Sequence, residues 1–102
     1  MKEIKWIAEN IREELEDAEK YATAALKYKD TDWDLSQTLA GLAKQELTHS
    51  ELLHNHAVKL IKEYREKNGP PPAAMAAVWD WEHEKMIEDT AHVKQLLEMY
   101  RG

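Results

Sequence analysis

The strongest constraint on the fold is that helix-breaking residues gather at only two places in the chain. The chain contains three glycines and three prolines, and four of these six residues stand in the segment NGPPP at residues 68–72. Proline cannot continue a helix, and Asn68 or Gly69 can adopt the positive-φ conformation that ends one. The second break is the segment KDTD at residues 29–32, where an aspartate or the threonine can cap the start of a helix.

The sequence between these breaks is rich in alanine, leucine, glutamate, lysine and methionine, which favour helix. We therefore predict helices over about 2–29, 32–67 and 72–100. A length of 102 residues suits one domain, which we place at residues 1–102. Because short connections make neighbouring helices antiparallel, the sequence predicts an all-α fold, an up-down-up three-helix bundle.

Each predicted helix repeats apolar residues at intervals of three or four, which is typical of one buried face. The first stripe contains Ile4, Ile7, Ala8, Ile11, Leu15, Ala18, Ala22, Ala25 and Leu26. The second contains Leu35, Leu39, Leu42, Leu53, Ala57, Leu60 and Tyr64. The third contains Met75, Val78, Trp79, Met86, Val93, Leu96, Leu97 and Tyr100.

The predicted helices are long for such a short chain, which indicates association. At 1.5 Å per residue the second helix is roughly 50 Å long, so a three-helix monomer is thin. Trp6 and Trp81 fall outside the main stripes of their helices. We expect a homo-oligomer, most simply a two-fold dimer that completes the bundle; the alternative is that these tryptophans are isolated surface residues.

Composition excludes several classes of function. The chain has 14 basic and 20 acidic residues and a net charge of −6, which argues against a nucleic-acid partner. It has no cysteine, so thiolate metal sites and disulfides are excluded. No apolar run approaches the ~20 residues of a membrane span, and the N-terminus lacks a signal-peptide core. We expect no membrane association and a cytoplasmic location.

One acid falls in the middle of the second apolar stripe. Glu46 has Leu39, Leu42, Leu53 and Leu60 around it, and His49 lies one turn later on the same side. Folding the first helix onto the second brings position 14 opposite about position 47, so Glu14 should lie beside this pair. Because an uncompensated buried carboxylate is costly, the arrangement predicts a cation at Glu14, Glu46 and His49, with a polar core as the alternative.

These residues resemble the first half of a ferritin-like di-iron site. The pattern is Glu14-x6-Tyr21 on one helix and Glu46-x-x-His49 on the next, as in rubrerythrins and encapsulated ferritins. The resemblance implies that Glu14, Glu46 and His49 bind iron, that Glu46 bridges two ions, and that Tyr21 hydrogen-bonds to the ligands. It also implies iron(II) oxidation of the ferroxidase type, although whether the chain is an enzyme stays open. Carboxylate and imidazole ligands also permit manganese or zinc.

The chain lacks the second helix pair of that family, which leaves two routes to a complete site. Glu82, Asp89 and His92 lie on the third helix and offer additional ligands within one subunit, since Asp89-Thr-Ala-His92 resembles a shortened Glu-x-x-His. In the other route a two-fold dimer supplies the first three ligands twice, as in encapsulated ferritins. We favour the dimer, because aspartate is shorter than glutamate and reaches poorly across a bundle.

Three further histidines are assigned other roles. His54 and His83 should face each other between the second and third helices as a contact rather than as metal ligands, and His56 should lie on the surface. Most of the chain, including KEY at 62–64 and NGPPP at 68–72, also resembles short bacterial helical proteins. The alternative function is a non-catalytic helical module with a ferritin-like pattern but no functional metal, whose tryptophan-bearing faces bind protein.

Overall fold

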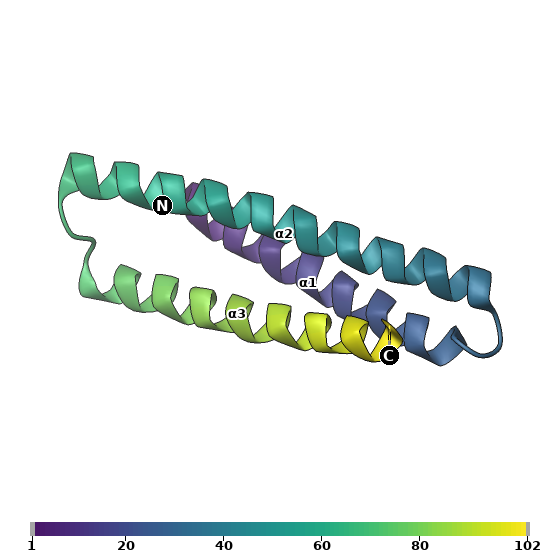
Figure 1. Cartoon of the computed structure of the whole chain (residues 1–102). Coiled ribbons are helices and arrows are strands. Elements are labelled where there is room, and N and C mark those ends of the chain that lie inside the picture. Colours follow the sequence, from purple (N-terminus) through teal and green to yellow (C-terminus); the bar gives the residue numbers. More distant parts are fainter. Residues whose placement is uncertain (1, 102) are drawn as a thin grey trace.

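Three α-helices form the chain in the computed structural model, which describes residues 2–101. They are α1 (Lys2–Tyr28), α2 (Trp33–Asn68) and α3 (Ala73–Arg101). The prediction of an all-helical chain is confirmed, and each predicted boundary differs from the observed one by at most one residue. Consecutive helices run in opposite directions, and the two connections lie at opposite ends of the rod (Figure 1).

Local capping explains where α2 begins and ends. The side chain of Asp32 accepts a 3.1 Å hydrogen bond from the backbone N–H of Leu35 and so caps the first turn. At the other end Gly69 has φ 75° and ψ −161°, a conformation that is essentially restricted to glycine. Its N–H donates to the carbonyl of Arg65 at 2.9 Å. The sequence left open whether Asn68 or Gly69 adopts the positive-φ conformation that ends the helix. Gly69 does so, and Asn68 is the last residue of α2.

Helix α1 supplies most of the core, because it packs against both other helices while α2 and α3 make few contacts with each other. Its predicted stripe is confirmed in large part, with Ala8 and Leu26 only partly buried. The buried residues of α1 are Ile4, Ile7, Ile11, Leu15, Ala18, Ala22 and Ala25.

The predicted stripe of α2 packs against the core, since Leu39, Leu53, Ala57 and Leu60 are partly buried there, but it is not the most deeply buried part of the helix. The residues that α2 buries are small: Ser36, Ala40, Ala43 and Ser50. Alanines of α1 join Ala40 and Ala43 in one core cluster, and small side chains let two helix backbones approach closely. The leucines flank this seam, and none of those predicted is fully buried: Leu35 is 38% exposed, and Leu39, Leu42, Leu53 and Leu60 are partly buried.

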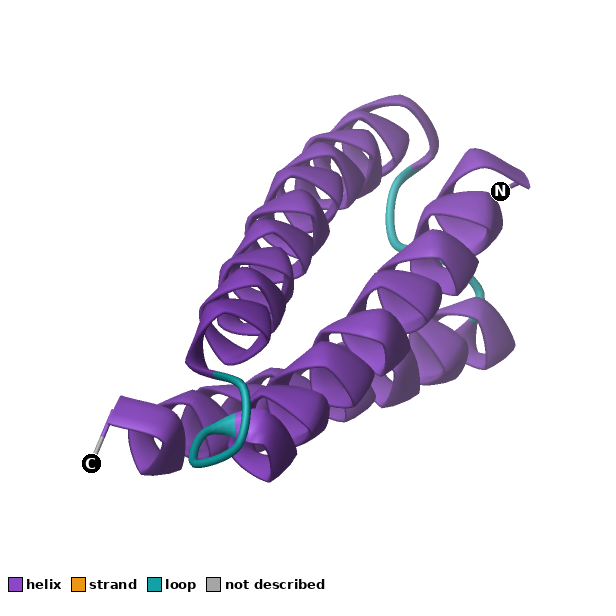
Figure 2. Ribbon diagram, turned by 90° about the vertical axis from the view of Figure 1, so that its right-hand side faces the viewer, coloured by secondary structure: helices purple, strands orange, loops and turns teal. Residues whose placement is uncertain are grey.

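Helix α3 is deeply buried only in its C-terminal half. Val93, Leu97 and Tyr100 enter the core there, and the Tyr100 ring stacks on Trp33 with centroids 5.9 Å apart. This contact holds the C-terminal end of α3 near the turn between α1 and α2 (Figures 1 and 2). In the N-terminal half of α3 the three helices leave a groove of about 650 Å³, and an ion pair between Arg12 and Glu82 at 2.6 Å spans it.

The resulting molecule is a thin rod of 55 × 18 × 17 Å with a radius of gyration of 16.3 Å, against about 13 Å for a compact chain of this length. Its accessible surface is 7011 Å², whereas roughly 5,900 Å² is typical of a monomer of this mass. Within residues 2–101, no helix has the combination of length and apolar character that crossing a bilayer requires.

Candidate metal centre

Three of the predicted ligands come together in the seam between α1 and α2. Glu14 projects from α1, and Glu46 and His49 project from adjacent turns of α2. Each offers one ligand atom, and these atoms lie within 4.8 Å of one another. The antiparallel pairing of α1 and α2 brings Glu14 to the same level along the helix axes as Glu46. The three-residue spacing in α2 places Glu46 beside His49.

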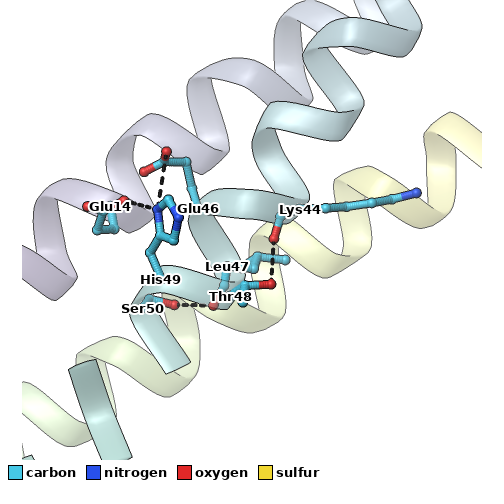
Figure 3. A network of polar contacts seen from close by, with 7 residues as sticks. All are labelled: Glu14, Lys44, Glu46, Leu47, Thr48, His49 and Ser50. Atoms are coloured by element: carbon cyan, nitrogen blue, oxygen red, sulfur yellow. Dashed lines mark hydrogen bonds and ion pairs between the residues drawn. The ribbon is translucent and has the colours of Figure 1, made fainter. Parts of the chain in front are cut away.

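One nitrogen of the His49 imidazole faces both carboxylates (Figure 3). Its Nδ1 atom is 3.4 Å from Oε2 of Glu14 and 3.7 Å from Oε1 of Glu46. The side chains of Glu14 and Glu46 are 27% and 18% exposed, whereas that of His49 is 52% exposed. The carboxylates thus form the floor of the cluster, and the imidazole forms its solvent-facing side.

Oε2 of Glu14 is a buried oxygen atom that accepts no hydrogen bond. Its 3.4 Å separation from His49 is within the range of an ion pair, but the geometry does not make a hydrogen bond. A buried carboxylate oxygen without a donor is costly. A proton or a metal ion at the centre of the cluster would relieve this cost.

The spacing of the cluster is compatible with a bound ion. Two ligands that lie at about 2.1 Å from one metal ion, at tetrahedral or octahedral angles, are separated by about 3.0–3.4 Å. The two distances from Nδ1 of His49 exceed this range by a few tenths of an ångström at most. All three ligand atoms lie within 4.8 Å of one another, so side-chain rotations must draw them closer together to close around one ion, and the exposed side would remain open for further ligands.

The three candidates on α3 make other contacts. Glu82 pairs with Arg12, Asp89 lies 3.3 Å from Lys85, and His92 lies 3.3 Å from Glu19. Positions 12 and 14 of α1 are about 160° apart around the helix axis. Because α3 contacts the Arg12 side of α1, the structure does not bring Glu82, Asp89 or His92 to the cluster of Glu14, Glu46 and His49.

The remaining predicted side chains lie outside the cluster. Tyr21 is partly buried against the alanine-rich core, and within residues 2–101 no hydrogen bond joins its hydroxyl to either carboxylate. His54 and His83 stack between α2 and α3 with ring centroids 5.3 Å apart, as predicted for a contact. His56 is exposed, also as predicted.

The sequence analysis did not predict the contacts that Glu82 and His92 make with α1. Arg12 and Glu19 lie seven residues apart, on the edge of α1 opposite Glu14. That edge carries the two side chains that pair with Glu82 and His92. A charged pair at heptad spacing beside an apolar stripe could have indicated that α3 packs there.

Comparison with known proteins adds no assignment, because no family model, no curated protein and no solved structure matches the chain.

Proposed function

We propose that the chain is a ferritin-like metal-binding protein in which Glu14, Glu46 and His49 bind iron(II). The observation that carries this proposal is the convergence of three ligand atoms within 4.8 Å around the unpartnered buried oxygen of Glu14. Two carboxylates and one imidazole suit iron or manganese, and zinc is a further candidate. The two carboxylates neutralise a divalent ion, which offsets their burial.

The three ligands of one chain make half of a di-iron site, and we propose that a second copy supplies the other half. Residues on the exposed side of the cluster favour docking there: the leucines that flank Glu46 on α2 are only partly buried, and Trp6 on α1 is 61% exposed. The surface exceeds the monomer expectation by about 1,100 Å², and one partner in a stable interface buries about 800 Å².

Iron(II), when bound, would supply electrons for the reduction of dioxygen or peroxide. The residues of the chain would hold the ions: Glu14 and Glu46 from two helices, and His49 from the solvent-facing side, where room remains for the ligands of the second copy. The docked second copy would exclude water from this face. Ferroxidase-type activity is therefore the reaction that the proposal assigns.

Metal content tests the site. The protein is loaded anaerobically with iron(II), freed of excess metal and analysed for iron per chain, with its mass in solution measured in parallel. We expect about one iron per chain in a dimer. Glu14→Gln and Glu46→Gln should reduce bound iron at least ten-fold, whereas Glu13→Gln, at an exposed neighbouring position, should not. No retained iron, manganese or zinc would refute a metal site, and two irons per chain would refute the shared one.

A pair of leucines tests the dimer. Leu42 is partly buried one turn before Glu46, whereas Leu52 is 63% exposed on another side of α2. We expect Leu42→Glu to give a monomer that binds iron weakly, and Leu52→Glu to remain a dimer. A monomeric wild type, or a dimer unaffected by Leu42→Glu, would contradict docking through this face.

The second candidate function is a helical module that binds another protein without chemistry. Its support is the apolar surface that the chain leaves exposed outside the cluster, including Val58, Val78 and Trp81 at 51–58% exposure. A wild-type protein that retains no metal and stays monomeric in the two experiments above would favour this function.

A further inference from the structure

The imidazole rings of His54 and His83 stack across the gap between α2 and α3. Their centroids are 5.3 Å apart and their planes differ by 3°. His54 is partly buried and His83 is exposed, and both line the 650 Å³ groove. Because α2 and α3 make few contacts, this pair and the edge-to-face contact of Tyr64 with Trp79, with ring centroids 5.8 Å apart, are the aromatic links between the two helices within residues 2–101.

His54 is suited to bind metal at neutral pH. Burial, and after it the neighbouring imidazole of His83, lower the pKa of His54 below its ordinary value of 6.5, while the charge of Glu51 opposes them. A metal ion binds only the neutral imidazole, so a lowered pKa reduces competition from protons.

Each imidazole has a carboxylate one turn before it on its own helix. Glu51 precedes His54 by three residues, and Asp80 precedes His83 by three, a spacing that places side chains on neighbouring positions of the helix surface. Asp80 lines the groove together with the two histidines. Within residues 2–101, neither carboxylate joins the two imidazoles in a set of ligand atoms within 4.8 Å of one another, so water would complete the coordination of an ion held between the rings.

We propose that His54 and His83 bind one divalent transition-metal ion of the zinc, nickel or copper class, which clamps α2 to α3. Imidazole pairs favour these metals over iron and manganese. Two nitrogen ligands of one ion are about 3.0–3.4 Å apart, so the parallel rings must tilt toward each other. The sparse packing between α2 and α3 permits that movement.

This site is separate from the cluster of Glu14, Glu46 and His49. His54 lies five residues beyond His49, about 140° further around α2, on the side that faces α3. The inference therefore goes beyond the proposed function and does not rest on it. A test in a variant without the first cluster keeps the two outcomes distinct.

The test uses zinc with untagged, chelator-treated protein that carries Glu46→Ala and His49→Ala. Calorimetric titration should give one zinc ion per chain, and zinc should raise the melting temperature. His83→Phe preserves an aromatic ring for stacking but removes the ligand nitrogens. The His83→Phe variant should bind zinc at least ten-fold more weakly, and zinc should no longer raise its melting temperature. His56→Phe should change neither the zinc affinity nor the rise in melting temperature.

The proposal would be overturned if the Glu46→Ala/His49→Ala variant bound no zinc, or if its affinity were unchanged after His83→Phe. If the double variant does not fold, the wild type replaces it, and His83→Phe should lower the number of zinc ions per chain by one. In NMR spectra zinc should shift the ring protons of His54 and His83 together. Shifts confined to His56 would also overturn the proposal.

Discussion

The hydroxyl of Ser36 donates a 2.6 Å hydrogen bond to the backbone carbonyl of Ala25. Ala25 lies in the last turn of α1, where carbonyls lack a partner within their own helix. The amide of Lys29, which would continue the pattern, donates instead to Leu26 at 3.3 Å. Ser36 therefore supplies a donor to a carbonyl that would otherwise have none, and its hydrogen bond holds the first turn of α2 against the last turn of α1.

Replacement of this serine should destabilise the hairpin. Ser36→Ala leaves the carbonyl of Ala25 buried without a donor, so we expect a loss of about 1–3 kcal/mol in the free energy of unfolding. Ser50→Ala is the control, because Ser50 is also buried but donates to Leu47 within its own helix. Urea denaturation measures both, and equal losses would contradict the role given to Ser36.

The same glycine-to-alanine change should have opposite effects at two positions. Gly69 has φ 75°, so Gly69→Ala should cost about 1–3 kcal/mol. Gly41 lies inside α2, and a Cβ there meets no atom within 4 Å, so Gly41→Ala should stabilise the protein by up to about 1 kcal/mol. Thermal denaturation would disprove this reasoning if both variants shifted the melting temperature in the same direction.

The seam between α1 and α2 should not tolerate larger side chains. Ala22 is 0% exposed in the alanine-rich cluster, so Ala22→Leu should reduce the free energy of unfolding by about 1–3 kcal/mol. Ala77→Leu makes the same change at an exposed position of α3 and should stay within about 0.5 kcal/mol of the wild type. A neutral Ala22→Leu in chemical denaturation would show that the seam is loosely packed.

The stability of the metal-free protein should fall on acidification through His54. Because the pKa of His54 is lowered on folding, the unfolded state binds more protons than the folded state below about pH 6.5. The stability that depends on a neutral His54 is fully present above pH 6.5. It is lost as the pH falls toward the pKa that His54 has in the folded state. Denaturation between pH 7.5 and 5.5 should show a smaller decrease in His54→Gln than in the wild type. His56→Gln should follow the wild type, and identical profiles for all three would count against the effect.

Much of the candidate site could be predicted because it depends on short-range geometry. The turn at residues 29–32 determines which residues of the first two helices lie side by side, and so places Glu14 next to Glu46. The helical period places Glu46 beside His49. One ligand atom from each of Glu14, Glu46 and His49 lies within 4.8 Å of the other two in the structure. The surroundings of Asp89 and His92 could not be predicted, because they depend on which side of α1 receives α3.

The sequence by itself determined the three helices and their ends, since the cap at Asp32, the glycine at 69 and the three prolines act within a few residues. It also determined the buried face of α1, where one apolar stripe stands alone. Only the tertiary structure decided the rotation of α2. That helix carries both a small-residue seam and a leucine stripe, and the packing of Ala40 and Ala43 in one core cluster with the alanines of α1 favoured the seam. The leucines around Glu46 consequently remain partly buried at the edge of the candidate site.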